Sequence, residues 1–290
     1  MSKTSKNSWF RNFVWILPAL CFIGAIVYYS IGFTFRLSLV DWNGMLSVPM
    51  KEVGLDNYKK VFSDPVFYKC IKNTVVFFVI TFVIQNFLGF IFAAILHSDV
   101  KLVTVHKCLI FIPTILAPAT MAPVFRLLFS PQGLLQSIFD TLHLPIAVNW
   151  LSRPTTSLIV LMVVAIWQYT GMSFILYYAA MSQIDGEMLE AAQIDGAGNI
   201  RILWSMVFPG CRGTTVSMAM LGVIGALKTF DLPWLITPNS LMHATEFLGT
   251  YIYRLGVKQA HFGLAAALSV CLLVLAVLGA LLTSRANKAE

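Results

Sequence analysis

The stretch EAAQIDGAGNIRILWSMVFP, residues 190–209, is the feature around which the rest of the chain is arranged. It lies in a polar insert between two long apolar segments, and its pattern predicts two short helices. Asp185 can cap the first helix, because its carboxylate can accept a hydrogen bond from a backbone N–H of the first turn. Gly196 stands where that helix must end in a left-handed residue, a conformation that glycine adopts at little cost. Asn199 can cap the second helix, which we expect to stop near Pro209 because proline has no N–H to donate.

The composition is that of a membrane protein. Of the 290 residues, 58% are hydrophobic and only 11% are charged, whereas charged residues make up about 25% of an average soluble protein. The net charge of +7 is scattered between apolar segments, so membrane topology explains it better than binding to nucleic acid. The five cysteines have no short spacing, so neither a disulfide framework nor a zinc site is predicted.

Six apolar windows are long enough to cross a bilayer with a core of about 30 Å. They cover residues 14–35, 74–96, 108–129, 157–181, 214–236 and 262–283. The first window follows basic residues, as a signal sequence does, but it is longer than a cleavable one, so we interpret it as an uncleaved span. The third window carries Pro113, Pro118 and Pro123, which predict a bent helix whose freed carbonyl groups are satisfied by neighbouring helices or water.

We therefore predict an all-α membrane protein. A single domain of six transmembrane helices would cover residues 14–284, with tails at 1–13 and 285–290 and a polar loop at 182–212. Lys and Arg are divided nine against nine between the two sides of this topology, so the totals do not decide the orientation. The basic cluster before the first span favours cytoplasmic termini, and this orientation also places the polar loop in the cytoplasm.

The polar loop resembles the EAA loop of ABC importer permeases. The pattern of that loop is Glu-Ala-Ala, three residues, Gly, nine residues and then Ile-x-Leu-Pro. Here Glu190, Ala191, Ala192, Gly196 and Pro209 stand at the matching offsets, and Met206 and Phe208 replace the Ile and Leu. The run Ile194-Asp195-Gly196-Ala197 is similar to the version in the carbohydrate-importing branch. The Asp41-Trp42 segment after the first span is also similar to that branch, so the resemblance covers essentially the whole chain.

The resemblance implies a type I ABC importer permease with a cytoplasmic coupling helix between its fourth and fifth spans. The residues implied to couple to an ATPase are Glu190, Ala191, Ala192, Asp195, Gly196 and Pro209. The implied partners are a second homologous permease subunit, two ATP-binding cassette ATPase subunits and an extracytoplasmic solute-binding protein, in a bacterial or archaeal plasma membrane. ATP and Mg would be bound by the partner ATPase and no cofactor by this chain. The implied solute is a sugar or oligosaccharide, with a polyamine or glycerol phosphate as the alternative.

A substrate path is predicted from polar residues at membrane depth, because an unpaired polar group in hydrocarbon costs several kcal/mol. The candidates are Asn86, Arg126, Trp167, Gln168, Tyr169, Lys228 and Asp231, together with Gln85. Our hypothesis is a sugar path in the bundle interior, with the amide of Gln168 between two aromatic platforms. The alternatives are a structural salt bridge between Lys228 and Asp231 on one helix and an Arg126 that only snorkels to the interface.

Catalytic signatures are absent from the sequence. It contains no P-loop, no G-x-S-x-G and no H-E-x-x-H, so we expect neither ATP hydrolysis nor a metal site in this chain. The remaining alternative is a secondary carrier or channel that works alone. Against it, no span is rich in the acidic residues of a proton relay and no inverted repeat is visible.

Overall fold

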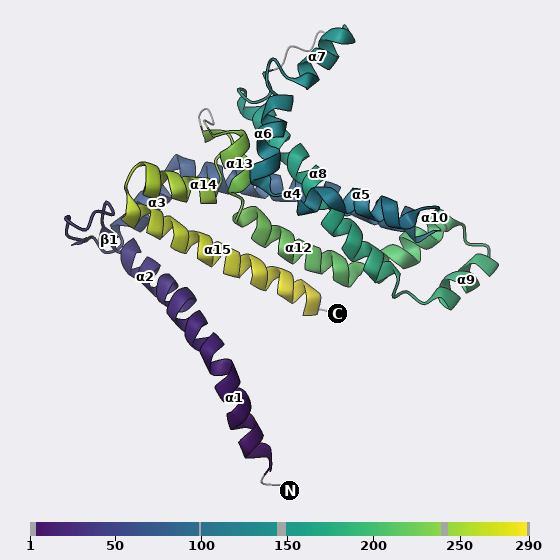
Figure 1. Cartoon of the computed structure of the whole chain (residues 1–290), viewed down its shortest axis with the longest axis horizontal. Coiled ribbons are helices and arrows are strands. Elements are labelled where there is room, and N and C mark those ends of the chain that lie inside the picture. Colours follow the sequence, from purple (N-terminus) through teal and green to yellow (C-terminus); the bar gives the residue numbers. More distant parts are fainter. Residues whose placement is uncertain (1–3, 99, 144–148, 239–242, 289–290) are drawn as a thin grey trace. The chain divides into compact units, whose positions relative to one another are not determined.

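The computed structural model describes residues 4–98, 100–143, 149–238 and 243–288, and helices dominate it (Figure 1). The chain divides into two compact units. The first unit contains the described residues up to Asp64 together with Ile252–Leu273, and the second contains Pro65–Tyr251 with the described residues from Val274 onward. Of the predicted tails, residues 1–3 and 289–290 lie outside the described part, and the prediction of one domain over 14–284 stays a prediction.

The first unit begins with one long apolar helix that is followed by a small packed cap. Its elements are α1 (Thr4–Ile23), η1 (Gly24–Tyr28), α2 (Tyr29–Ser38), β1 (Val40–Asp41), β2 (Lys51–Glu52), α3 (Asp56–Ser63), η4 (Arg254–Lys258) and the start of α15 (Phe262–Lys288). The two short strands pair antiparallel, with Val40 opposite Glu52.

The cap is held together by one buried amide and one aromatic pair. Asn57 is 2% exposed, and its Nδ2 donates to the carbonyl oxygens of Ser38 and Val40, both at 2.9 Å. Trp42 packs on Phe262 with ring centroids 5.7 Å apart, and the backbone N–H of Phe262 donates to the Trp42 carbonyl oxygen at 3.0 Å. The segment that follows the first span is therefore fixed by polar contacts that a free loop would not have.

The second unit is built around two long helices, α4 (Pro65–His97) and α8 (Pro154–Met181), which pack against each other. The other elements are α5 (Val103–Ile115), α6 (Pro118–Leu128), α7 (Leu134–Thr141), α9 (Gly186–Ile194), α10 (Asn199–Ile202), η2 (Leu203–Val207), α11 (Phe208–Gly210), α12 (Arg212–Leu227), α13 (Asp231–Ile236) and α14 (Leu248–Tyr253). Helices α14 and α15 each contain residues of both units. In the apolar stretch of α8, 56% of the residues are buried within the chain, compared with 28% in the apolar stretch of α4. Helix α8 is therefore the central helix of this unit.

Two glycines allow α8 to approach its neighbours closely. A Cβ atom on Gly89 of α4 would stand 2.5 Å from the Cβ of Ser173, and one on Gly171 would stand 2.6 Å from the carbonyl oxygen of Ile110 in α5. Both distances are shorter than any ordinary van der Waals contact. Small residues at helix crossings let backbones pack closely in membrane proteins, so these two glycines set the spacing of α4, α5 and α8.

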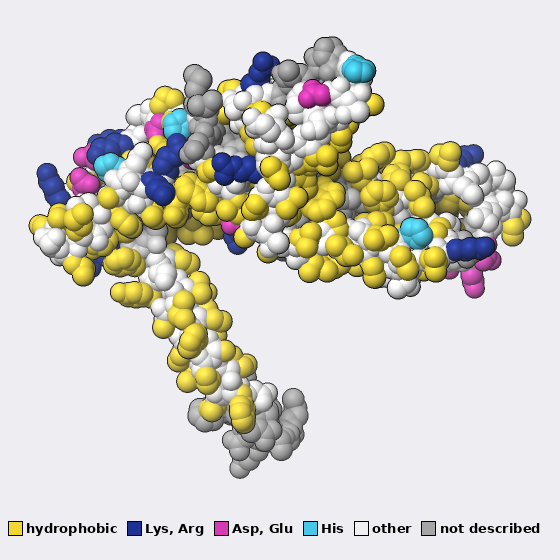
Figure 2. Space-filling model, turned by 45° about the horizontal axis from the view of Figure 1, so that its top comes forward, with side chains coloured by type: hydrophobic (Ala, Val, Ile, Leu, Met, Phe, Trp, Pro, Cys, Tyr) yellow, Lys and Arg dark blue, Asp and Glu magenta, His cyan; other side chains and the backbone are white. Residues whose placement is uncertain are grey.

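Four described helices are long and apolar enough to cross a membrane, or up to six if each of two bent pairs forms one span. The four are Asn12–Ser38, Pro65–His97, Pro154–Met181 and Phe262–Arg285. They contain the first, second, fourth and sixth predicted windows, which are confirmed as single helical segments. In Figure 2, hydrophobic side chains cover the surface of the part that holds α5 and α8, where Leu109, Ile112 and Val163 are exposed. Such a surface suits lipid tails rather than water.

The third window is bent, as its prolines predict. Helices α5 and α6 meet at 93°, and Pro118 is the first residue of α6. The side chain of Gln168 in α8 donates its Nε2 to the carbonyl oxygen of Leu116 at the break, at 3.0 Å. In return, Thr114 Oγ1 donates to the backbone carbonyl of Gln168 at 2.8 Å. A neighbouring helix therefore supplies the partner that the break requires.

The fifth window, 214–236, is not one helix. Helix α12 ends at Leu227, and α13 starts at Asp231. The bent pair that is long and apolar enough to form a span here is Asn199–Gly210 with Arg212–Leu227, and its two helices meet at 61°. The physical reason is Pro233, whose ring in a continuous helix would clash with the carbonyl group of Thr229, four residues earlier.

Candidate functional site

The polar loop folds as a helical hairpin, residues 186–210, that begins with α9. Asp185 caps α9 as predicted, since its Oδ1 accepts from the Glu187 N–H at 3.0 Å. Gly196 has φ +86°, the left-handed conformation that was expected of it. The N–H of Gly196 donates to the Gln193 carbonyl at 3.0 Å, and the N–H of Ala197 donates to the Ala192 carbonyl at 2.9 Å. This pair of bonds is the Schellman arrangement, which ends a helix on a left-handed glycine.

The second half of the hairpin differs from the prediction at its start. Gly198, not Asn199, is the residue before α10, and no side chain caps this helix end. Asn199 is already helical, so this helix begins one residue earlier than it would with Asn199 as its N-cap. The helix then passes through the π turn η2 and ends with α11 at Gly210. The predicted stop near Pro209 is confirmed.

The hairpin has one exposed face and one packed face. Exposed residues include Glu190, Ala191, Asp195, Gly196 and Pro209, together with the apolar Met188, Ile194 and Ile200, which are 44%, 87% and 77% exposed. On the packed face, the half-buried Leu189, Ala192 and Ala197 rest on a core cluster that includes Phe90, Met181 and Ile202. The core therefore holds the hairpin in place while a mixed charged and apolar surface stays open.

An aromatic cluster joins the hairpin to the long helices. Phe90 of α4 is 1% exposed, and its ring centroid lies 5.6 Å from that of Tyr177, 5.6 Å from that of Trp204 and 5.2 Å from that of Phe208. Tyr177 Oη and Thr215 Oγ1 are 2.9 Å apart and share a hydrogen bond. Because Trp204 and Phe208 belong to the second half of the hairpin, this cluster connects it with α4 and α8 directly.

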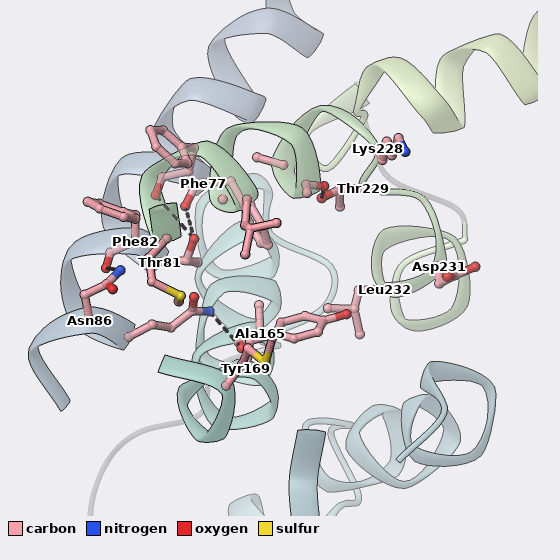
Figure 3. A pocket seen from close by; sticks show the side chains of 18 of the residues that line it. Phe77, Thr81, Phe82, Asn86, Ala165, Tyr169, Lys228, Thr229, Asp231 and Leu232 are labelled. Atoms are coloured by element: carbon pink, nitrogen blue, oxygen red, sulfur yellow. Dashed lines mark hydrogen bonds between the residues drawn. The ribbon is translucent and has the colours of Figure 1, made fainter. Parts of the chain in front are cut away.

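A pocket of about 390 Å³ lies between α4, α8, α12 and α13 (Figure 3). Its lining is mainly aromatic and aliphatic with a few polar groups, which is the usual character of a binding site for a small molecule. The residues that line it include Phe77, Phe78, Thr81, Phe82, Gln85, Asn86, Tyr169, Lys228, Thr229, Phe230 and Asp231.

The polar groups of this pocket are fixed by α4 and α8. Gln85 Nε2 donates to the Ala165 carbonyl at 3.0 Å, a bond drawn in Figure 3. Asn86 Nδ2 donates to the Phe82 carbonyl at 2.7 Å, while its Oδ1 is buried and accepts no hydrogen bond. A buried acceptor without a partner is costly, so Asn86 carries an unused hydrogen-bond acceptor in a residue that lines the pocket.

Five of the predicted path residues line this pocket, namely Gln85, Asn86, Tyr169, Lys228 and Asp231. The other three do not. Trp167 is 43% exposed and packs on Phe125 with ring centroids 5.1 Å apart, and Gln168 is 2% exposed at the α5–α6 break. Successive helical residues point about 100° apart, so residues 167–169 cannot all face one pocket.

Lys228 and Asp231 lie on either side of the break between α12 and α13 (Figure 3). Both are exposed, and the structure records no ion pair between these two described residues. The alternative of a salt bridge within one helix is therefore wrong, because the helix does not continue through both positions. Both residues belong to the pocket lining.

Arg126 lines a second pocket of about 320 Å³. This pocket lies where α6 and α13 end, beside the turn at residues 149–152. Arg126 was grouped with the other path residues because of its depth in the sequence window, but the bend at Pro118 carries it to a different place.

Sequence reasoning missed the aromatic and hydroxyl part of the first pocket. Phe77, Phe78, Thr81 and Phe82 line it. With Gln85 and Asn86 they recur every four residues along α4, which is the spacing of one helix face. This periodicity was readable in the sequence, but an apolar stripe alone does not distinguish a pocket from a packed core.

Long apolar helices, a pocket within the span region and a hairpin with an open face together describe a membrane transport subunit. The model of the family described as "binding-protein-dependent transport system inner membrane component" matches residues 102–288. The chain belongs to this family. It is thus a multi-pass membrane protein, and the resemblance to ABC importer permeases is confirmed.

Relatives of known name match over nearly the full length. The probable ABC transporter permease YurN of Bacillus subtilis is 29% identical, with 91% of each chain covered. The lactose transport permease LacF of Rhizobium radiobacter is 28% identical, with 96% of each chain covered. In a solved bacterial ABC transporter for import of the acidic polysaccharide alginate, one chain superposes with a TM-score of 0.85 at 20% identity, covering 99% of this chain and 98% of that one. A likeness at this identity shows the fold alone.

Proposed function

We propose that this chain is one of two permease subunits in an ATP-driven, binding-protein-dependent importer of a sugar or oligosaccharide. Family membership supports the importer class, and the lactose permease among the relatives supports the solute class. The observation that carries the proposal is the hairpin at 186–210, which is anchored on one face and open on the other.

The open face of the hairpin is the proposed ATPase contact. Ile194 is 87% exposed in a segment outside the four long apolar helices, and exposed apolar groups that gather on one surface are typical of a protein contact. Glu190 offers a carboxylate to a basic partner residue, a strong type of hydrogen bond. The partner ATPase would bind ATP and Mg, and this chain would respond to its movement.

The aromatic cluster is the proposed mechanical link. Rotation or displacement of the hairpin moves Trp204 and Phe208, which press on Phe90 of α4 at ring distances of 5.6 and 5.2 Å. Packed cores are bistable rather than continuously deformable. A shift at the hairpin is thereby passed to α4 and α8, two of the helices that line the first pocket.

The first pocket is the proposed translocation site. Sugars present hydroxyl groups and apolar ring faces, so they need hydrogen-bond partners beside aromatic side chains. Asn86 Oδ1 supplies an acceptor without an internal partner, and Phe82 and Tyr169 supply aromatic surface in the same lining. Lys228 and Asp231 add one charge of each sign.

The remaining partners complete the assembly. A second, homologous permease would close the pore, and two ATPase subunits would bind on the hairpin side. With both termini cytoplasmic, a solute-binding protein would dock from outside the plasma membrane of a bacterium or archaeon. A solved complex of the alginate transporter with its pentasaccharide-bound periplasmic protein has the same fold at a TM-score of 0.83, which supports such a partner.

The proposal is tested by gentle affinity purification of the tagged chain from its own membranes, followed by mass spectrometry. We expect an ATPase, a second permease and a solute-binding protein to be recovered. A chain that is recovered alone and still transports solute in liposomes without ATP would instead establish a secondary carrier. Competition of uptake by sugars, polyamines and glycerol phosphate then identifies the solute class.

A further inference from the structure

The first and second pockets are lined by opposite ends of the same two helices. Helices α6 and α13 lie side by side (Figure 1). Pro118 and Asp231, at the starts of these helices, line the first pocket, whereas Arg126 and Ile236, near their ends, line the second. Both helices therefore run in the same direction from one pocket to the other.

The separation of the two pockets is short. At 1.5 Å per helical residue, Pro118 and Arg126 are about 12 Å apart along α6. Helix α8 begins at Pro154, next to the turn at 149–152 that lines the second pocket, and ends at Met181 beside the hairpin. The second pocket thus lies toward the end of the unit that is opposite the hairpin, where a solute would enter before it reaches the first pocket.

The second pocket contains a cation whose donors are not used by any residue that the structure describes. No hydrogen bond or ion pair is recorded for the Arg126 side chain with any described residue. The same holds for the Asn149 amide and the Ser152 hydroxyl, which line the pocket with it. Apolar walls come from Pro131, Leu151, Ile236 and Pro238. The pocket therefore offers a guanidinium fork, an amide and a hydroxyl between surfaces that fit the C–H face of a sugar ring.

Acidic residues that could neutralise Arg126 are scarce here. The sequence has no Asp or Glu between Asp140 and Asp185, and none between Asp231 and Glu246. Asp140 already accepts a hydrogen bond from Gln136 Nε2 at 2.9 Å. The described residues that line the second pocket include no Asp or Glu, so an anion that enters it would meet the guanidinium without a competing carboxylate from this lining.

We propose that this second pocket is an entry subsite for a sugar unit that carries a carboxylate group. Arg126 would bind the carboxylate through two parallel N–H···O bonds, the geometry that its planar fork favours. Asn149 and Ser152 would bind the ring hydroxyls. One cation matches one negative charge, whereas a phosphate group of nearly two charges would call for a second cation in the lining. This inference rests on the proposed function, because it assigns the outer part of the same solute path.

The test measures binding to the purified importer, with its partner subunits, in lipid nanodiscs without the solute-binding protein. The probes are trigalacturonate and its fully methyl-esterified form, which keeps the size and loses the charge. The variants are Arg126→Gln, Arg126→Lys and, as a matched control, Arg153→Gln. Arg153 is also exposed, lies just before α8 and does not line the pocket. Arg126 is exposed and makes no recorded contact, so both substitutions should leave folding intact.

We expect the wild-type importer to bind trigalacturonate about tenfold or more tightly than the ester, since charge-assisted bidentate bonds are strong ones. Salt should weaken the binding of the acid and not of the ester. Arg126→Gln should bind both forms equally, Arg126→Lys should keep part of the preference, and Arg153→Gln should behave as wild type. If Arg126 only snorkels to the interface, Arg126→Gln should keep the preference for trigalacturonate over its ester.

The inference is overturned if wild type binds neither probe, if it binds both equally, or if Arg126→Gln keeps the preference. If any of these results is obtained with an importer that still takes up its own solute with ATP, the proposed function stands. A chain that purifies without an ATPase and transports without ATP would instead remove the proposed function itself.

Discussion

Replacement of Gly196 by aspartate tests the role of the hairpin most directly. Gly196 has φ +86°, and a left-handed conformation costs an L-residue about 1–2 kcal/mol, with aspartate at the lower end because it can hydrogen-bond locally. No atom lies within 4 Å of the position that a Cβ would take, so the substitution meets strain but no collision. A cost of this size is small for a chain of long buried helices, and we expect Gly196→Asp to insert and fold.

The strain acts locally on the end of α9. If the turn relaxes, the bonds from Gly196 to Gln193 and from Ala197 to Ala192 are weakened together, and Glu190 and Ala191 are displaced relative to the core. A matched control is Gly198→Asp. Gly198 has φ −71° and ψ 156°, precedes α10 and also has open space around it. Aspartate there adds the same charge two residues away without strain, and as an N-cap in place of glycine it should stabilise α10 by only about a few tenths of a kcal/mol.

The assay is the reconstituted importer in vesicles, with ATP hydrolysis and solute uptake measured in parallel. We expect Gly196→Asp to be present in the membrane at the wild-type level and to lose most uptake per ATP hydrolysed, while Gly198→Asp keeps it. Normal transport by Gly196→Asp would refute the assignment of the hairpin to coupling. Equal losses in both variants would show that the added charge, rather than the backbone conformation, is responsible.

Three further variants test packing and the pocket. Phe90→Ala should lower the free energy of unfolding by about 3–5 kcal/mol, as expected for a buried phenylalanine. Phe90→Leu should fold but lower the uptake of solute per ATP hydrolysed. Gly171→Ala should destabilise by about 1–3 kcal/mol through overpacking against α5, measured as the denaturant midpoint of the purified chain. Asn86→Ala should raise the KM of uptake at nearly unchanged melting temperature, whereas Gln168→Ala should lower the melting temperature because the carbonyl at the α5–α6 break loses its partner.

Each of these has its own contradicting result. Wild-type coupling in Phe90→Leu would exclude the aromatic cluster as the link. Gly225→Ala, on α12 with open space around it, is the control for Gly171→Ala, and equal stability of the two variants would contradict the close α5–α8 contact. An unchanged KM in Asn86→Ala would remove the first pocket from the solute path, and an unchanged melting temperature in Gln168→Ala would show that water replaces its side chain.

Much of the fold was predictable because it depends on local rules. Four of the six apolar windows are single helices, since in lipid a run of about 20 apolar residues has few other ways to satisfy its backbone. The cap at Asp185, the left-handed Gly196 and the bend at Pro118 follow from the stereochemistry of single residues and their neighbours. The family resemblance was readable for the same reason, because it rests on residue types at set offsets.

What the tertiary structure alone decided is which side chains face one another. Sequence placed residues 167–169 together, but α8 turns only Tyr169 into the first pocket, while Gln168 binds the backbone at a break in another helix. The close approach at Gly171 and the position of Arg126 in the second pocket depend on contacts between residues that are far apart in the sequence. Hydrophobic periodicity specifies that a face is apolar, but packing decides whether that face meets lipid, a neighbouring helix or a cavity.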